Sequence, residues 1–327
     1  MKPDYLLGFD IGGTKCAVVL GRKVPAGVEI LERTAFATET ALGPQSVLAA
    51  LENRTQELLP RHGLVHSNIS GIGISCGGPL DGRRGVILSP PNLPGWDEIH
   101  VTGYFEAALQ IPARLQNDAD ACALAEWKWG AGRSCQNMIF LTFGTGMGAG
   151  LILDGRLYTG TNNLAGEVGH VRLEKDGPLG YGKPGSVEGF CSGGGIARLA
   201  QQEIRKLWEK NGEVLFCRNE KALAQLSARE VIEAARAGDP VGVSIFNIVA
   251  EHLGRSLAML IDILNPELIV IGGIFMRHHD LFEATVERVI RDEALAASTR
   301  TCRVVPAVLG EAIGDFACLS VAASVLG

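Results

Sequence analysis

The sequence predicts an α/β protein with two lobes, and three features of the chain support this fold class. Two segments about 130 residues apart each have the pattern of a strand, a glycine turn and a second strand, which suggests two related domains. Amphipathic stretches of helical length separate further strand-like runs, as in other α/β proteins. The chain has 327 residues, 46% of them hydrophobic, which is enough for two cores of ordinary size.

The first lobe is expected to contain four strands and a connecting helix. We place this lobe at residues 1–117, together with a C-terminal helix at residues 311–327. β-Branched and apolar runs predict its strands, and an amphipathic segment predicts the helix. The expected strands are near residues 5–11, 15–20, 27–37 and 70–75, and the helix is near residues 44–59.

The second lobe, residues 118–310, is expected to contain the longest helices. Their periodicity places them near residues 194–209, 227–238 and 240–264. Asn265 and Pro266 end the last of these helices, because proline cannot continue it. Residues 211–227 are polar and mixed, and they suggest no function.

The composition excludes several classes of protein. A net charge of −6 and a pI near 5.7 argue against a nucleic-acid partner held by general basicity. We expect no membrane span, because no uncharged apolar run reaches about 18 residues, and the first residues lack the pattern of a signal peptide. The eight cysteines include no pair with CxxC spacing, which favours reduced thiols in a cytoplasmic protein.

The first glycine turn lies in GFDIGGTKCAVVL, residues 8–20. Its glycines have nearly the spacing of a P-loop, but Thr14 and Lys15 stand in the reverse of the required order. A β-branched run follows instead of a helix, so we expect a β-hairpin whose turn can bind phosphate through backbone N–H groups. An ordinary hairpin without a ligand explains this motif equally well.

Two more glycine turns follow. The segment MIFLTFGTGMGAGLILDGRLY, residues 138–158, also predicts strand, turn and strand, because the helix that a dinucleotide-binding fingerprint requires is missing. In NPELIVIGGIF, residues 265–275, Gly272 and Gly273 leave bare backbone against which a flat ring could pack. A simple strand-to-helix turn is the alternative for this last segment.

The segment ARLQNDADACALAEW, residues 113–127, joins a strand to a helix. The strand-like run reaches residue 116, and Asp118 stands where the helical pattern begins. A helix N-cap is the ordinary explanation for an aspartate at such a position. Asp120 is a rival carboxylate two residues further on, and we expect it to be a solvated residue of the first helical turn.

Five motifs, in this order along the chain, resemble those of the ROK family of sugar kinases within the actin-like ATPase and hexokinase superfamily. They are DIGGTK, QNDADACALAE, FGTGMGAG, AGEVGH and LNPELIVIGG, and the resemblance covers roughly residues 5–326. It implies an α/β, two-lobed actin-like ATPase (ribonuclease H-like) fold with a central cleft.

The resemblance also implies that ATP and Mg2+ are bound at the glycine turns. Asp10 would face the magnesium ion carried by ATP, so its carboxylate would not confront bare phosphate. The expected nucleotide-binding residues are Gly12, Gly13, Thr14, Lys15, Gly144, Thr145, Gly146, Gly148, Gly272 and Gly273.

By the same resemblance, Asp118 would be the catalytic base that takes a proton from the 6-hydroxyl of a sugar as this oxygen attacks the γ-phosphorus. A pyranose pocket should supply several fixed carboxylates and amides. The expected sugar-binding residues are Gly78, Asn92, Asn117, Glu167, His170 and Glu188. Taken singly, His170 could be a core histidine, Glu188 a helix-start residue and Asn92 a turn former.

One segment departs from the family pattern, in which three cysteines and a histidine hold a structural zinc. Leu179, Tyr181 and Ser186 stand at the cysteine positions, and His170 alone cannot hold the metal. We therefore expect no zinc. Packing should hold the segment instead, with Leu179 and Tyr181 turned inward and Pro184 stiffening the turn.

The predicted function is ATP-dependent phosphorylation of a hexose or N-acetylhexosamine on the 6-hydroxyl, with the sugar and ATP as partners and a homodimer as the assembly. A sugar-responsive regulator of the same family is one alternative. It is disfavoured because the first strand starts within about ten residues of Met1, which leaves no room for a preceding DNA-binding segment. A catalytically silent sugar-binding protein is another, and the presence of Asp10 and Asp118 argues against it. The identity of the sugar stays open.

Overall fold

The computed structural model describes residues 5–325, which form two compact units. The first unit contains the described residues up to Phe140, Gly150–Ala165 and those from Val308 onward, and the second contains Leu141–Ala149 and Gly166–Ala307. The division therefore does not fall at residue 117, where the sequence analysis places it. Helix α3 (Asp118–Trp129) stays with the first unit because it packs against α12 (Ile313–Ala323) of that unit.

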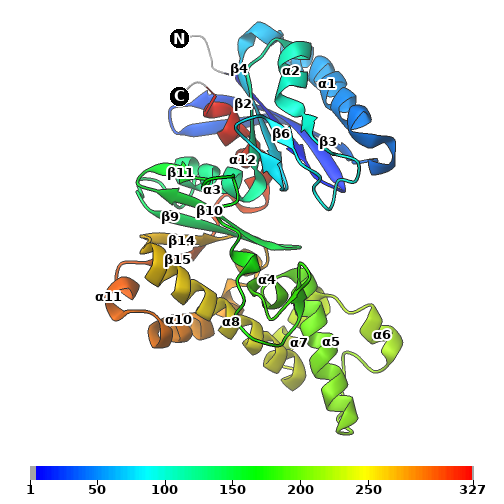
Figure 1. Ribbon diagram of the computed structural model, residues 1–327, viewed down its shortest axis with the longest axis vertical. Helices are drawn as coiled ribbons and strands as arrows, with labels where there is room; N and C mark the ends of the chain where they lie inside the picture. Colours follow the sequence, from blue (N-terminus) through cyan, green and yellow to red (C-terminus); the bar gives the residue numbers. More distant parts are fainter. Residues whose placement is uncertain (1–4, 326–327) are drawn as a thin grey trace. The chain divides into compact units, whose positions relative to one another are not determined.

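The first unit contains the strands and the helix that the sequence predicts for its first 76 residues. Helix α2 is not predicted by the sequence analysis, since its nine residues are too few to show a clear period. Besides α3 and α12, the elements of this unit are β1 (Tyr5–Ile11), β2 (Lys15–Val24), β3 (Gly27–Ala37), α1 (Gly43–Arg61), β4 (Ile69–Cys76), β5 (Leu80–Asp81), β6 (Val86–Ile87), β7 (Ile99–His100), α2 (Val101–Leu109), β8 (Ala113–Asn117) and β11 (Arg156–Tyr158) (Figure 1).

The first sheet has the strand order β3-β2-β1-β4-β8. β1 pairs antiparallel with β2 and parallel with β4, and β4 pairs parallel with β8. Ile11 is in register with Cys76, and Cys76 with Asn117, so the carboxyl ends of three parallel strands meet at one edge. In α/β sheets this is the edge at which ligands bind.

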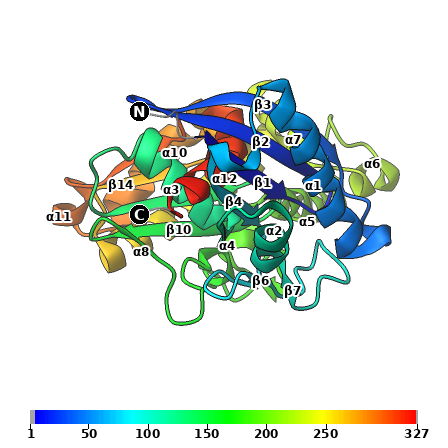
Figure 2. The same cartoon turned by 90° about the horizontal axis from the view of Figure 1, so that it is seen from above.

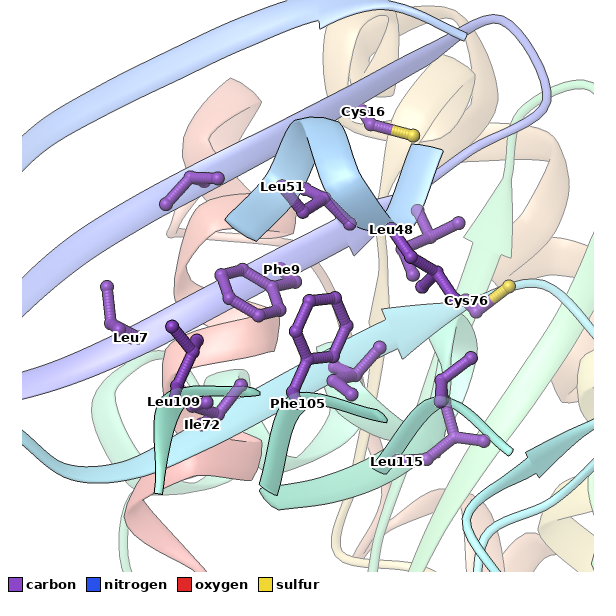
Figure 3. Close-up of a cluster of buried hydrophobic side chains, with 14 of the residues drawn as sticks. Leu7, Phe9, Cys16, Leu48, Leu51, Ile72, Cys76, Phe105, Leu109 and Leu115 are labelled. Atoms are coloured by element: carbon purple, nitrogen blue, oxygen red, sulfur yellow. The ribbon is translucent and has the colours of Figure 1, made fainter. Parts of the chain in front are cut away.

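Helices α1 and α2 cover one face of this sheet (Figure 1, Figure 2). Alternate residues of β1, namely Leu7, Phe9 and Ile11, point to this face and are at most 1% exposed. Figure 3 shows Phe9 against Phe105 of α2, and the two ring centroids lie 4.6 Å apart. This apolar cluster fixes the sheet whose edge carries the first group of candidate residues.

Helix α12 covers the opposite face at very short range. Leu6 of β1 belongs to the apolar cluster formed with Cys318 of this helix. A Cβ atom added at Gly8 would lie 2.2 Å from Cys318 Sγ, and one added at Gly73 would lie 2.0 Å from the carbonyl oxygen of Cys318. Only glycine allows so close an approach, so these two residues set the position of α12 on the sheet.

The second unit carries the remaining helices and part of a second sheet. The strand order of this whole sheet is β11-β10-β9-β14-β15. The division between the units passes through β9 and β10. The elements are β9 (Met138–Phe143), β10 (Met147–Leu153), β12 (Leu179–Gly180), β13 (Lys183–Pro184), α4 (Val187–Phe190), α5 (Gly193–Glu209), α6 (Glu220–Ala224), α7 (Ala228–Arg236), α8 (Pro240–Leu264), β14 (Leu268–Ile271), α9 (Gly273–Arg277), α10 (His279–Glu293), α11 (Ala296–Thr299) and β15 (Arg303–Pro306).

Local signals define the bounds of α8, which matches the helix expected at residues 240–264. The Asp239 carboxylate accepts hydrogen bonds from the N–H groups of Val241 and Gly242, and Asn265 ends the helix in a left-handed conformation. α8 then packs against α7 and α10. Within residues 5–325, no helix has both the length and the apolar character needed to cross a membrane.

Candidate active site

The first glycine turn joins β1 and β2 as a hairpin, as the sequence predicts. The N–H of Gly12 donates to the carbonyl oxygen of Lys15 at 3.2 Å. Thr38 donates its hydroxyl to the carbonyl oxygen of Gly12 at 2.7 Å and its N–H to that of Thr14 at 2.9 Å. These bonds fix the turn and leave Thr14 and Lys15 exposed.

Asp10 precedes this turn and is half-buried. The pKa of Asp10 is raised to about 6, because burial disfavours its charge and because the carboxylates of Asp315 and Asp118 act on it. Arg33 and Lys15 oppose this shift, and Arg33 Nε also donates to Asp315 Oδ1 at 2.8 Å. A divalent cation at Asp10 would relieve the repulsion among these carboxyl groups.

Asn92, Asn117 and Asp118 meet over the backbone of Gly77 and Gly78, just after β4. A Cβ atom added at Gly77 would lie 3.8 Å from Asn92 Nδ2 and 4.0 Å from Asp118 Oδ2. One added at Gly78 would lie 3.2 Å from Asn117 Nδ2. The structure thus brings the expected base together with three of the expected sugar-binding residues. The sequence analysis misses Gly77, although the two glycines are adjacent.

Asn117, not Asp118, caps helix α3. The N–H of Ala119 donates to Asn117 Oδ1 at 2.9 Å and to Asp118 Oδ1 at 2.8 Å. Asp118 is exposed, so a ligand can reach its side chain. The expectation of a solvated Asp120 is wrong, because this residue is 3% exposed and accepts a hydrogen bond from Gln116 Nε2 at 2.7 Å.

The second glycine turn joins β9 and β10 in the second unit. The Thr142 hydroxyl accepts a hydrogen bond from the N–H of Gly148 at 2.9 Å, and the N–H of Gly144 donates to the carbonyl oxygen of Gly146 at 3.1 Å. A Cβ atom added at Gly144 would meet no atom within 4 Å. Open space therefore lies over Gly144, and Thr145 beside it is exposed.

The third glycine motif packs directly against the second. The N–H of Gly272 donates to the carbonyl oxygen of Leu141 at 2.9 Å. Gly273 has a φ of +63°, and a Cβ atom there would lie 2.1 Å from the carbonyl oxygen of Phe143 and 3.4 Å from the N atom of Gly144. The motif is also the turn from β14 to α9, so its glycines serve the fold as well as any ligand.

The start of α5 also lies beside the second turn, which the sequence analysis misses. Ser192 caps this 17-residue helix, and the N–H of Gly193 donates to the carbonyl oxygen of Gly144 at 2.8 Å. The positive end of a helix favours anions. A serine followed by three glycines, CSGGG at residues 191–195, was the available signal.

Glu188 of α4 lies against the second turn. Its Oε2 accepts a hydrogen bond from the N–H of Met147 at 3.2 Å and would lie 2.8 Å from a Cβ atom at Gly146. Gly169 belongs to the short 3-10 helix Val168–His170. A Cβ atom added at Gly169 would lie 2.2 Å from the carbonyl oxygen of Met147. Two parts of the expected sugar site are therefore packed onto the expected phosphate turn.

Glu167 precedes this short 3-10 helix, and His170 is its last residue. Glu167 is exposed and His170 is partly exposed, so His170 is not a core histidine. The His170 ring meets the Tyr181 ring edge-on, with centroids 5.2 Å apart. Lys183 Nζ donates to the carbonyl oxygen of His170 at 2.6 Å.

The expected packing of the segment without zinc cysteines is wrong. Leu179 and Tyr181 are 50% and 64% exposed, so neither is turned inward. Polar contacts hold the segment instead. The buried Ser186 caps α4 with its hydroxyl, and Arg255 of α8 donates to Glu174 Oε1 at 2.7 Å.

Each unit offers groups of a kind that bind a nucleotide carrying magnesium. In the first unit, Asp10 offers a carboxylate beside the first turn, and magnesium needs only one or two protein carboxylates when phosphate and water complete its shell. In the second unit, the second turn offers backbone beside the open space at Gly144, which a larger side chain would fill. Asp10 would hold the ion.

The family model described as "ROK family" matches residues 6–322. The chain belongs to the ROK family. A glucokinase from Halalkalibacterium halodurans is 31% identical to this ROK protein over 275 residues, which cover 84% of this chain and 81% of the relative. A xylose repressor from Caldicellulosiruptor bescii is 28% identical over 293 residues, which cover 89% of this chain and 71% of the repressor.

Solved structures agree with this assignment. A ROK family glucokinase from Streptomyces griseus, in complex with glucose and AMPPNP, is 28% identical, and the match covers 98% of this chain and 99% of that chain with a TM-score of 0.74. The comparison confirms the predicted α/β actin-like ATPase fold for this ROK protein. Its relatives include both sugar kinases and a repressor.

Proposed function

We propose that this ROK protein is an ATP-dependent kinase that phosphorylates a hexose or N-acetylhexosamine on its 6-hydroxyl, with Asp118 as the general base. The observation that carries the proposal is the meeting of Asp118 with Asn92 and Asn117 over Gly77 and Gly78. This places a carboxylate among amide groups suited to sugar hydroxyls. The glucokinase relatives support the same reaction class.

Asp118 acts as the proton acceptor. Its Oδ1 accepts a hydrogen bond from the N–H of Ala119 at 2.8 Å, and its side chain is exposed, so a sugar hydroxyl can reach the carboxylate. As the sugar oxygen attacks the γ-phosphorus of MgATP, its proton passes to Asp118, the new O–P bond forms, and the bond from phosphorus to the oxygen of ADP breaks. The products are a sugar phosphate and ADP. Asp10 would hold the magnesium ion that accompanies ATP, and this ion would supply neutralisation of charge on the phosphates.

The second unit contributes binding groups. We assign phosphate to its glycine turn, where open space lies over Gly144 and Thr145 is exposed. Glu167, His170 and Glu188 contribute oxygen and nitrogen atoms for sugar hydroxyls. From the family motif LNPELIVIGG, we assign the adenosine to the turn at Gly272 and Gly273.

ADP release with a panel of sugars tests the function. Glucose, mannose, fructose, allose, N-acetylglucosamine and N-acetylmannosamine are each offered with ATP and Mg2+, and ADP is followed by a coupled assay. We expect at least one sugar to raise ADP release far above the rate without sugar, together with a 6-phosphate product. If every sugar leaves the rate at background, the kinase proposal is wrong.

A sugar-responsive regulator is the second candidate, because a xylose repressor is among the relatives. It would bind a sugar without releasing ADP, and the sugar would change its retention on DNA. Calorimetry with the same panel, run beside a DNA-retention assay, separates the two functions.

We also propose that the protein is a homodimer in the cytoplasm. Light scattering of the purified protein tests the assembly, and cell fractionation tests the location.

A further inference from the structure

A cavity of about 580 Å³ lies in the first unit, at the tip of the β2–β3 hairpin. Its lining comes from residues 23–27 of the hairpin, residues 127–129 at the end of α3, and Arg133 and Ser134 just beyond. β2 runs ten residues from Lys15 to Val24, about 33 Å of extended chain. The cavity is therefore at the far end of β2 from the first glycine turn and is not part of the candidate active site.

The cavity is cationic. Lys23, Lys128 and Arg133 line it, and none of the described residues in its lining is acidic. Lys128 Nζ donates to the carbonyl oxygen of Ser320 at 3.2 Å, and Arg133 donates to that of Ala26. Both of these bonds go to backbone oxygen, so neither charge is neutralised by them.

Lys128 is in an environment that disfavours its charge. The pKa of Lys128 is lowered by burial first, and then by the nearby charges of Lys23 and Arg114. Arg114 itself donates to the carbonyl oxygen of Ser324 at 2.7 Å. A bound anion would offset this repulsion between cations that come from three different elements.

Two aromatic residues at the end of α3 also contribute to the lining of the cavity. Trp127 and Trp129 both line it. Gly27 has a φ of +148°, and a Cβ atom there would lie 3.2 Å from Trp129 Cδ1 and 3.5 Å from Arg133 Nη2. The Trp129 indole and the Arg133 guanidinium therefore both lie next to the backbone of Gly27 at the hairpin tip. Aromatic side chains of this kind stack on the flat rings of ligands.

The C-terminal end of α3 does not by itself explain why three cations and two tryptophans line this cavity. Cations in the last turn of a helix interact favourably with its carbonyl groups, which accounts for Lys128. It does not account for Lys23 from β2 or for the two tryptophans around an open volume.

We propose that this cavity is a binding site for a small phosphate-bearing metabolite, with Lys23, Lys128 and Arg133 contacting the phosphate and the tryptophans contacting the rest. The volume suits a molecule of mononucleotide or sugar phosphate size.

Calorimetric titration of the full chain tests the site with three probes: inorganic phosphate, AMP and a hexose 6-phosphate. The variants are Lys128→Met and Arg133→Gln, and the matched control is Lys206→Gln, an exposed lysine of α5. Binding that survives both variants belongs to other sites, so only the component that they remove is assigned to the cavity. The probe that binds most tightly identifies the source of the phosphate.

We expect at least one probe to bind with a Kd of about 1 mM or tighter, and each variant to weaken that binding about tenfold or more, as for loss of a charged hydrogen bond. The control should bind like the natural sequence, and added salt should weaken the binding. Arg133 is exposed, so its variant remains informative if Lys128→Met fails to fold. Either of two results overturns the proposal: no saturable binding of any probe, or binding that neither variant changes.

Discussion

The two glycine turns have the same strand–turn–strand form but different chemical surroundings. The first turn follows Asp10, which is crowded by the carboxylates of Asp315 and Asp118. The second turn has the start of α5 at Gly193 on one side and a single carboxylate, Glu188, hydrogen-bonded to its backbone. One local motif therefore occurs among carboxylates in the first unit and beside the start of a helix in the second.

This difference shows that a glycine turn alone does not determine what it binds. Residues far away in the sequence supply the charges around it, as Asp315 does for the first turn. An acidic setting suits phosphate that carries a magnesium ion, whereas a helix start suits phosphate directly. The variants below test whether the two turns differ in this way.

Asp118→Asn should have the largest effect, because it removes the proposed base beside the first turn. We expect kcat to fall by about 10²- to 10⁴-fold, as for loss of a general base. Sugar affinity, measured by calorimetry, should change little because the amide keeps the shape of the side chain. Asp120→Asn in the same helical turn is the control, and it should lower stability more than kcat, since Asp120 is buried. Near-normal turnover of Asp118→Asn would exclude the assignment.

Asp10→Asn should lower kcat and change how the free energy of unfolding depends on pH. Because the pKa of Asp10 is raised to about 6, the folded state binds this proton more tightly than the unfolded state. Its contribution to stability therefore falls as pH rises from about 4 to 6. Asp10→Asn removes this cost and should raise the free energy of unfolding at pH 8 by about 1–3 kcal/mol, while kcat falls.

Urea unfolding at pH 4.5 and pH 8 measures the effect of Asp10, with the exposed Asp292→Asn of α10 as the control. The kcat/KM of the natural sequence for MgATP should also decline as pH falls below about 6, because the carboxyl of Asp10 in the free protein is then protonated and must lose its proton before it can bind a cation. A variant less stable than the natural sequence at pH 8 would contradict the acidic character assigned to the first turn.

Two glycines of the second unit should separate binding from folding. A Cβ atom at Gly144 meets nothing within 4 Å, so Gly144→Ala should leave the melting temperature nearly unchanged and raise the KM for ATP about tenfold or more. A Cβ atom at Gly273 would lie 2.1 Å from the carbonyl oxygen of Phe143, so Gly273→Ala should cost about 2–4 kcal/mol of stability. Equal effects of the two variants on stability and on KM would contradict the proposal that phosphate binds in the open space over Gly144.

Glu188→Ala and Glu188→Gln test the support of the second turn. Alanine removes the acceptor for the N–H of Met147, and we expect a rise of about 2- to 10-fold in the Kd for AMPPNP measured without sugar. Glutamine keeps an oxygen acceptor and should restore most of the affinity. If Glu188 only binds the sugar, both variants will bind AMPPNP like the natural sequence.

Metal removal should have the smallest effect. The residues at the usual cysteine positions are Leu179, Tyr181 and Ser186, and the segment is held by the Ser186 cap and by Arg255. Dialysis against EDTA should therefore leave the melting temperature unchanged, and elemental analysis should find no stoichiometric zinc. Zinc at one atom per chain would contradict this.

Local patterns in the sequence predict the glycine turns and the long helices α5, α7 and α8. The bounds of α8 follow from Asp239, Pro240 and Asn265, which act within a few residues of the helix ends. The hairpin form of the first turn follows from the β-branched run after Lys15. The ROK motifs and the missing cysteines are likewise visible in the chain alone. Capping, periodicity and turn chemistry are short-range effects, so a local pattern is enough to predict them.

The surroundings of these elements depend on how distant parts of the chain pack together. Parallel pairing of β1, β4 and β8 brings Gly77 to Asp118, and the packing of α12 brings Asp315 near Asp10. It also buries Asp120, which the sequence pattern suggests is solvated. Burial and charge depend on residues that are distant in the chain. For this reason the pKa of Asp10 and the cationic cavity at Lys128 follow from packing and not from any local motif.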